Sequence, residues 1–257
     1  MKIEFYKYQG TGNDFVIIDN RLDLFPKEDA QLISKICDRR FGVGADGLLL
    51  LENHSTLDFT MVYYNADGNL GSMCGNGGRC MVHFANFLNI IKNKTIFEAV
   101  DGIHEATILD EIVSLKMNDV TKVNVSPNYV FLDTGSPHHV ELVDDLENYN
   151  VKKEGASIRN VTYEKKGANI NFVEAKDKNT FGVRTYERGV EAETLSCGTG
   201  VTAVAIALFE TNKTTSNNVR LKTKGGTLKV SFDKTDAVYT NVYLEGPATQ
   251  VFKGNWK

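Results

Sequence analysis

The chain has 257 residues, of which 42% are hydrophobic and 24% are charged, and this is the composition of a globular protein. It excludes a long disordered or collagen-like chain, and the length suits one large domain or two compact ones. The formal net charge is −4, from 29 basic and 33 acidic residues. Because such a chain has no global attraction for a phosphate backbone, we expect no nucleic-acid partner.

The apolar runs and the cysteines predict a soluble cytoplasmic protein with reduced thiols. No apolar run approaches the roughly 18 residues of a membrane span, and charges interrupt residues 1–7, where a signal peptide would be apolar. The four cysteines are Cys37, Cys74, Cys80 and Cys197. They have neither the spacing of a zinc site nor the density of a disulfide framework. We therefore expect no membrane association and no metal.

Short segments rich in Ile, Val, Phe, Tyr and Thr predict a chain dominated by strands. The expected strands are residues 2–8, 15–19, 57–64, 95–100, 106–109, 112–117, 139–143, 170–174, 180–186, 219–223, 227–232 and 237–244. One helix is expected at 28–37 from apolar positions near 3.6-residue spacing, and two more follow glycine-rich turns at 77–91 and 200–210. This mixture indicates an α+β fold.

The sequence matches itself when it is shifted by 123 positions, which places Cys74 on Cys197. The other matched segments are Thr11-Gly12 with Thr134-Gly135, Gly44-Ala45 with Gly167-Ala168, Gly75 with Gly198, and Gly77 with Gly200. Coincidence is the alternative, but identities that gather at turn glycines and at a cysteine favour an internal repeat. The repeat predicts two pseudo-symmetric halves, residues 1–118 and 119–257, with the final strand packed on either half.

Each half carries a Cys-Gly-x-Gly turn at the start of a helix, at residues 74–77 and 197–200. Glycine lets the backbone approach a ligand closely, and the N-terminus of a helix attracts anions. The same field lowers the pKa of a thiol from about 8.5 toward neutrality. Cys74 and Cys197 are therefore expected to be partly ionised beside a carboxylate site. Cys37 and Cys80 meet no cysteine after the shift, and we interpret them as core residues.

Two thiols on opposite sides of one ligand suit proton transfer at a stereogenic carbon. One thiolate removes the α-proton, and the opposing thiol delivers a proton to the other face. The two helix N-termini stabilise the negative charge that develops on the ligand. A single cysteine beside glycines is usually inert packing, but two cysteines in matched turns favour catalysis.

Several motifs resemble those of the diaminopimelate epimerase family. They are residues 10–15, 42–47, 65–68, 73–80, 167–169, 187–190 and 193–200, in the family's order, and the resemblance runs from about residue 2 to 246. It implies an epimerase that uses no cofactor and interconverts LL- and meso-diaminopimelate for lysine and peptidoglycan synthesis. It also implies that each half is a mostly antiparallel sheet wrapped around a central helix, that the active site lies in the cleft between the halves, and that the protein is a homodimer.

The resemblance also assigns roles to individual residues. Cys74 and Cys197 match the catalytic pair, and His138 and Glu187 match polar residues that bind or tune the reaction centre. The expected substrate ligands are Asn13, Asn65, Gly75, Asn76, Asn169, Glu187, Arg188, Gly198 and Thr199. Of these, the three side chains Asn13, Asn65 and Asn169 join Arg188 in holding the distal end of the substrate, since arginine grips a carboxylate bidentately and amides both donate and accept. Ser136 stands where the family commonly has asparagine, and one extra residue lies between Arg188 and Thr194.

Three other functions compete with this interpretation. A proline or hydroxyproline racemase of the same fold would share both thiols, but its substrate lacks a distal amino-acid end. A cysteine hydrolase would need one nucleophile and a base such as His138, and it leaves the second cysteine unexplained. A non-enzymatic module that binds a small anion would not depend on either thiol.

Overall fold

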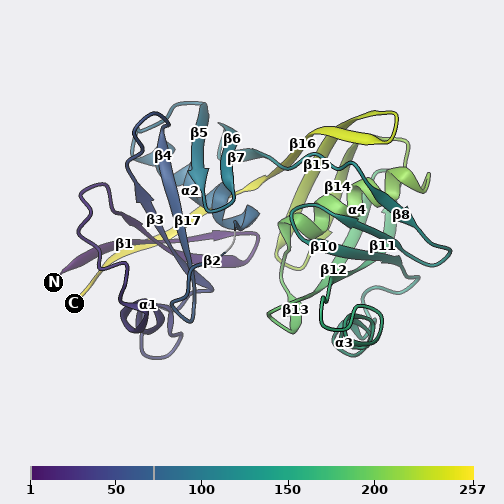
Figure 1. The fold of residues 1–257 in the computed structure, drawn as a ribbon, viewed down its shortest axis with the longest axis horizontal. Coiled ribbons are helices and arrows are strands. Elements are labelled where there is room, and N and C mark those ends of the chain that lie inside the picture. The colour runs from purple at the N-terminus through teal and green to yellow at the C-terminus, as the bar shows by residue number, and fades with distance from the viewer. Residues whose placement is uncertain (1, 72) are drawn as a thin grey trace. The chain divides into compact units, whose positions relative to one another are not determined.

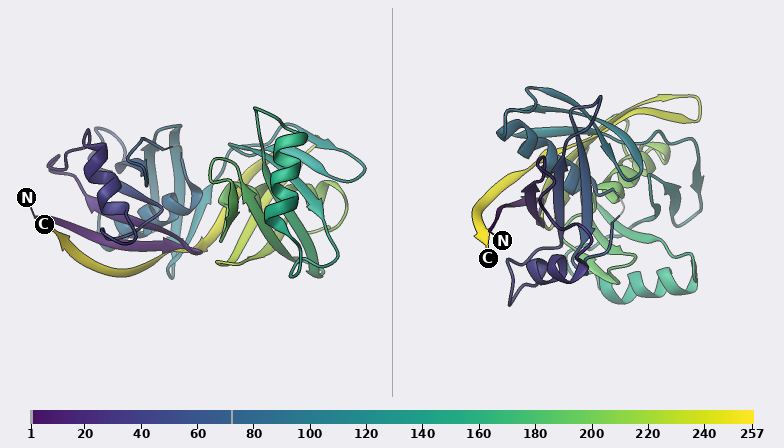
Figure 2. Two further views of the ribbon diagram at one scale, coloured as in Figure 1. Left: turned by 90° about the horizontal axis from the view of Figure 1, so that it is seen from below. Right: turned by 60° about the vertical axis from the view of Figure 1, so that its left-hand side comes forward.

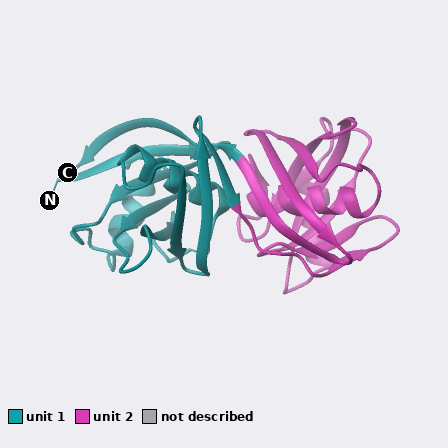
Figure 3. Ribbon diagram, turned by 90° about the horizontal axis from the view of Figure 1, so that it is seen from above, with its two compact units in different colours: residues 1–115, 246–257 teal, residues 116–245 magenta. Residues whose placement is uncertain are grey.

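The computed structural model describes residues 2–71 and 73–257, and this part of the chain forms four α-helices and seventeen β-strands (Figure 1). The chain divides into two compact units (Figure 3). Unit 1 comprises the residues up to Leu115 together with Gly246–Lys257, and unit 2 comprises Lys116–Glu245. The expected halves divide after residue 118, whereas these units divide after Leu115 and return the last strand to unit 1.

The described part of unit 1 is a mixed sheet with two helices, α1 (Ala30–Cys37) and α2 (Gly75–Phe87). Its strands, in their order of pairing, are β17 (Thr249–Trp256), β1 (Ile3–Gly10), β2 (Asn13–Asp19), β3 (Gly47–Glu52), β4 (Phe59–Asn65), β5 (Lys94–Ala99), β6 (Gly102–Leu109) and β7 (Ile112–Lys116). The β2–β3 and β4–β5 pairs are parallel, and the others are antiparallel.

Unit 2 repeats this arrangement with helices α3 (Val151–Val161) and α4 (Gly198–Glu210). Its strands, in order of pairing, are β8 (Val123–Val125), β9 (Val130–Asp133), β10 (Pro137–Leu142), β11 (Asn169–Asp177), β12 (Thr180–Glu187), β14 (Asn218–Thr223), β15 (Gly226–Thr235) and β16 (Val238–Pro247), with β13 (Ala192–Thr194) also paired to β12. Its parallel pairs, β10–β11 and β12–β14, occupy the corresponding places. The shared strand order confirms the internal repeat.

The two ends of the chain lie side by side in unit 1. β1 and β17 pair antiparallel, with Ile3 opposite Trp256, and they run together in both views of Figure 2. β8 pairs with β9 in unit 2 as β17 pairs with β1. Unit 1 is therefore completed by a strand from the far end of the sequence.

Each unit wraps its sheet around one buried helix, as the resemblance implies. In unit 2, β9 to β12, β14 and β15 contact α4, and residues 200–208 of α4 are all buried. A helix that is apolar on every side belongs in a core. In unit 1, α2 has the same place among β1 to β4, β6 and β17. No helix among the described residues is long and apolar enough to cross a membrane.

The smaller helices, α1 and α3, cover the outer faces of the sheets. Their packing explains why β3 shows no polar alternation and why the sequence did not predict α3. α1 packs against Val16, Leu48 and Leu50, so β3 is buried on both faces and has no polar alternation. α3 is absent from the sequence prediction because it is mostly polar and carries Gly155 in its middle. A Cβ at Gly155 would lie 2.4 Å from the Cβ of Tyr186, so the glycine allows close packing.

The central helix should carry much of the stability of unit 2. Ile206 in α4 is fully buried, whereas Val161 at the end of α3 is 76% exposed. We expect Ile206→Ala to lower the free energy of unfolding by about 2–5 kcal/mol, because it leaves a cavity in the core. Val161→Ala, measured in the same urea titration, should change it by less than about 0.5 kcal/mol. Equal effects of the two substitutions would contradict the central position of α4.

Candidate active site

The two candidate cysteines are the N-cap residues of the two central helices. Cys74 precedes α2 with φ −114° and ψ 118°, and Cys197 precedes α4 with φ −123° and ψ 114°. The cysteine carbonyls accept the first helical hydrogen bonds, from the amides of Gly78 at 2.8 Å and Val201 at 3.0 Å. Neither thiol caps its helix with a side-chain hydrogen bond. The positive end of each helix therefore acts on the thiol and on any anion bound beside it.

Three of the candidate residues meet around the thiol of unit 1. Sγ of Cys74 donates to Oδ1 of Asn13 across 3.5 Å, and Nδ2 of Asn76 donates to the same oxygen at 3.3 Å. Gly75 and Asn76 are the first residues of α2, so their amides lie at its positive end. Asn65 is the last residue of β4, and its side chain is exposed.

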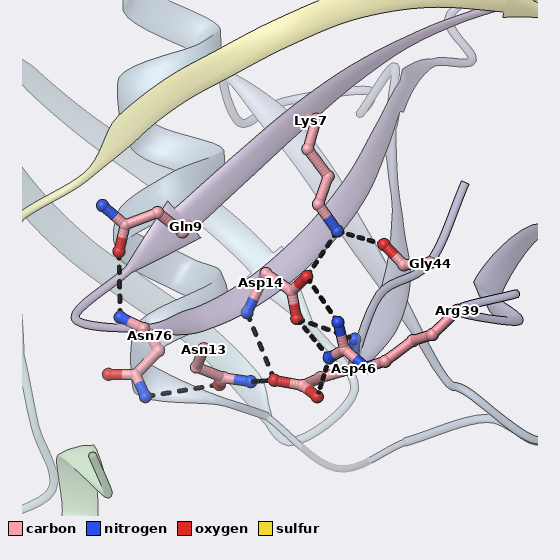
Figure 4. A network of polar contacts seen from close by, with 9 residues as sticks. Lys7, Gln9, Asn13, Asp14, Arg39, Gly44, Asp46 and Asn76 are labelled. Carbon is pink, nitrogen blue, oxygen red and sulfur yellow. Dashed lines mark hydrogen bonds and ion pairs between the residues drawn. The ribbon is translucent and has the colours of Figure 1, made fainter. Parts of the chain in front are cut away.

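An ionic network holds Asn13 in place (Figure 4). Asp46 accepts from Nδ2 of Asn13 at 2.6 Å, which turns Oδ1 toward the thiol. Arg39 bridges Asp14 and Asp46 at 2.7 and 2.6 Å, and Lys7 pairs with Asp14 at 2.5 Å. Burial acts to raise the pKa of Asp14, but the hydrogen bonds from Arg39 and Lys7 outweigh it and hold the pKa at about 2. Asp14 is therefore ionised at neutral pH, and the network that it anchors orients the amide of Asn13.

Arg79 is a fully buried cation behind the Cys74 turn. Its guanidinium donates to the carbonyl of Gly75 at 3.3 Å, to Oδ1 of Asn76 at 3.0 Å and to the hydroxyl of Thr11 at 3.3 Å. Its Nε has no partner among the described residues. Burial lowers the pKa of Arg79, and negative charge on the sulfur of Cys80 or Cys74 would oppose this shift. A buried cation held by neutral acceptors favours negative charge nearby.

In unit 2, Thr199 connects the thiol to a histidine. Oγ1 of Thr199 lies 3.5 Å from Sγ of Cys197 and 2.9 Å from Nε2 of His138. His138 is fully buried, and burial, assisted by the positive charge of Arg188, lowers its pKa to about 3. The imidazole is therefore neutral at physiological pH. It can donate or accept a hydrogen bond, but it does not place a positive charge near the thiol.

Asn169 connects this centre to Arg188. Its Nδ2 donates to the hydroxyl of Ser136 at 3.0 Å, and its Oδ1 accepts from the backbone amide of Arg188 at 2.8 Å. Ser136, which replaces the family's asparagine, thus contacts another candidate ligand. The Arg188 side chain is largely exposed and donates to the carbonyl of Lys166 at 2.9 Å. Glu187 is the last residue of β12 and directly precedes Arg188.

Two polar residues without a sequence-based role complete the unit 2 group. The hydroxyl of Thr134 donates to the carbonyl of Thr199 at 2.9 Å, and Nδ2 of Asn171 donates to Nδ1 of His138 at 3.2 Å. Thr134 is matched to Thr11 by the repeat, and Asn171 is an amide between the apolar residues Ile170 and Phe172 of β11. The match in the repeat and the amide within an apolar run were the sequence features that could have identified these two residues.

The remaining cysteines are buried and remain protonated. Burial raises the pKa of Cys37 to about 11 and that of Cys80 to about 12. Both thiols therefore behave as small core residues.

Comparison with known proteins gives consistent matches over nearly the whole chain. The family model described as Diaminopimelate epimerase matches residues 5–123 and 130–251. The diaminopimelate epimerase of Flavobacterium psychrophilum is 60% identical over 253 residues, covering 98% of this chain and 99% of that protein. The diaminopimelate epimerase of Chlorobaculum tepidum is 44% identical over 256 residues, covering 95% and 98%.

Solved structures show the same fold at low identity. A phenazine biosynthesis protein of the PhzF family from Bacillus anthracis has a TM-score of 0.80 at 14% identity, covering 100% of this chain and 99% of that one. A hydroxyproline epimerase from Agrobacterium vitis has a TM-score of 0.71 at 11% identity, covering 99% and 92%. At these identities the likeness concerns the fold alone, and it confirms the α+β architecture.

The neutral His138 should make folding stability depend on pH. The unfolded state binds a proton at this residue below about pH 6.5, whereas the folded state does so only near pH 3, so acid favours unfolding. We expect His138→Gln to reduce the slope of unfolding free energy against pH by about one proton, about 1.4 kcal/mol per pH unit, between about pH 4 and 6. Above pH 7 the slopes should coincide. Identical slopes in urea titrations at pH 5 would contradict a neutral buried imidazole.

Proposed function

Because the chain belongs to the diaminopimelate epimerase family, we propose that it interconverts LL- and meso-diaminopimelate without a cofactor. The observation that carries the proposal is the pair of cysteine N-caps, one on each central helix, with nearly the same backbone conformation. A reversible proton exchange at one carbon needs two groups of the same chemical type, because each acts as the base in one direction and as the acid in the other.

In the proposed reaction, one thiolate takes the α-proton while the other thiol delivers a proton to the opposite face. The C–H electron pair moves onto the adjacent carboxylate as an enediolate-like charge, and it returns when the new C–H bond forms. Gly75 and Asn76 of one helix, and Gly198 and Thr199 of the other, offer backbone amides to that charge. Cys74 and Cys197 exchange roles when the reaction reverses.

The substrate's distal amino-acid end is proposed to lie with Asn13, Asn65, Asn169 and Arg188. The exposed guanidinium of Arg188 and the two-sided amides suit a carboxylate and an ammonium. Glu187 and His138 are proposed to serve the reaction centre. We further propose that the enzyme works in the cytoplasm and that it is a homodimer. Sedimentation at micromolar concentration tests the dimer.

Turnover of LL-diaminopimelate in deuterium oxide tests the function directly. We expect the meso isomer to form with deuterium at the α-carbon, without any added cofactor. Cys74→Ser and Cys197→Ser should each lower kcat by about 10²-fold or more, since each removes an acid–base group. Cys37→Ala, a change at a buried cysteine of unit 1, is the matched control and should keep kcat within about twofold. A reduced enzyme that incorporates no deuterium would refute the proposal.

The choice between a long substrate and a cyclic amino acid rests on Arg188. We expect Arg188→Gln to raise KM for diaminopimelate about 10- to 100-fold, because a charge-assisted contact to the distal carboxylate is lost. Arg220, which is exposed on β14, is the matched control, and Arg220→Gln should leave KM unchanged. If proline were racemised faster than diaminopimelate, and if Arg188→Gln had no effect, the racemase alternative would replace this proposal.

A further inference from the structure

Asn171 is fully buried in unit 2, and both ends of its amide have partners. Nδ2 donates to the carbonyl of His139 at 2.9 Å and to Nδ1 of His138 at 3.2 Å, and Oδ1 accepts from the hydroxyl of Thr185 at 2.9 Å. A carbonyl can only accept, so the NH₂ group must face His139. The amide therefore has a single orientation.

This orientation decides where His138 carries its hydrogen. Because the NH₂ group of Asn171 points at Nδ1, Nδ1 must be the acceptor. A neutral imidazole has one N–H, so the hydrogen lies on Nε2. Asn169 also approaches Nε2 at 3.5 Å, but its amide makes the shorter contact to Ser136, at 3.0 Å.

The hydrogen on Nε2 in turn orients the hydroxyl of Thr199. Nε2–H donates to Oγ1 of Thr199 at 2.9 Å, so the hydroxyl hydrogen must point to another acceptor. Sγ of Cys197 lies 3.5 Å from Oγ1, which places it within reach as that acceptor. A donor aimed at sulfur stabilises the thiolate more than the thiol.

We propose that Asn171 is a positioning residue that holds His138 in the Nε2–H form and thereby directs the Thr199 hydroxyl toward Cys197. The inference deepens the proposed function, on which it rests, because it states how one of the two acid–base groups is tuned. In unit 1 the corresponding place beside Gly77 is lined by Phe15 and Leu49, whereas Asn171 lies beside Gly200. In the described part of the chain, the relay therefore lies beside Cys197 and has no counterpart beside Gly77.

The tautomer can be observed in the unaltered protein. In ¹⁵N-histidine NMR spectra we expect His138, assigned by its absence from His138→Gln, to be neutral with the hydrogen on Nε2 between pH 5 and 9. A hydrogen on Nδ1, or an imidazolium in this range, would overturn the proposal without any need for a variant of Asn171.

Asn171→Asp tests the relay, because a carboxylate in that place can only accept and so draws the hydrogen to Nδ1. At pH 8.5 we expect the NMR signal to report Nδ1–H, which makes Nε2 an acceptor and turns the Thr199 hydroxyl away from sulfur. Alkylation of Cys197 by iodoacetamide, followed by peptide mass spectrometry, should slow about 3- to 10-fold. Cys74 in the same molecules is the internal control and should react at the original rate.

The route through Thr199 is tested by a double-mutant cycle. Thr199→Val removes the hydroxyl at nearly constant volume, and in that background Asn171→Asp should slow Cys197 no further. Thr199→Ser keeps the hydroxyl and should restore the effect of Asn171→Asp. A reversed tautomer with an unchanged Cys197 rate, or equal slowing of Cys74, would overturn the proposal.

These measurements use no substrate, so their outcome is independent of the proposed reaction. If the enzyme failed to epimerise diaminopimelate, the tautomer and the thiol rates would still decide the role of Asn171. In the active enzyme, Asn171→Asp should lower kcat several-fold with little change in KM, whereas a general loosening of the site would change both.

Discussion

The structure depends on how two helices that are enclosed by strands begin. α2 and α4 are enclosed by strands, so the positive N-terminus of each is the place where the core must accommodate unsatisfied amides. Both helices begin after a cysteine whose thiol does not serve as a cap. Gly200 lets the backbone pass close to β11, since a Cβ there would lie 2.5 Å from Oδ1 of Asn171. The same turn therefore allows close packing and presents helix amides that are suited to bind an anion.

The two units share a backbone arrangement, but the charged and polar groups around their two candidate thiols differ. Behind Cys74 lies the buried cation Arg79, and a charged network orients Asn13 in front of the thiol. Behind Cys197 lies the neutral His138, and hydrogen bonds connect the amide of Asn171 to His138 and His138 to Thr199. The repeat supplies two thiols in equivalent positions, and the substitutions between the halves make them chemically different. Such a difference is compatible with a reaction that starts from two distinct stereoisomers.

The secondary structure was predictable wherever burial leaves a one-sided pattern. β5 alternates exposed and buried residues, and the segment 95–100 predicts it closely. β3 is buried on both faces, and its continuous leucines carry no period. α3 lacks a clear apolar stripe in the sequence, because only Val151 and Gly155 are buried and the other residues are exposed or half-buried. Both central helices begin two residues before the expected start, since the glycines interpreted as turn are already helical.

The sequence by itself determined the two repeated turns, the identity of the thiols and the list of polar candidates, because these are recorded in residue type and spacing. Only the tertiary structure decided what surrounds each thiol. Arg79 becomes a buried cation because α2 is enclosed, and Asn171 faces His138 because β10 and β11 pair in parallel at one register. These contacts join residues far apart in the chain, and no local pattern encodes them. The tuning of each group depends on burial and on hydrogen-bond direction, which exist only in the folded chain.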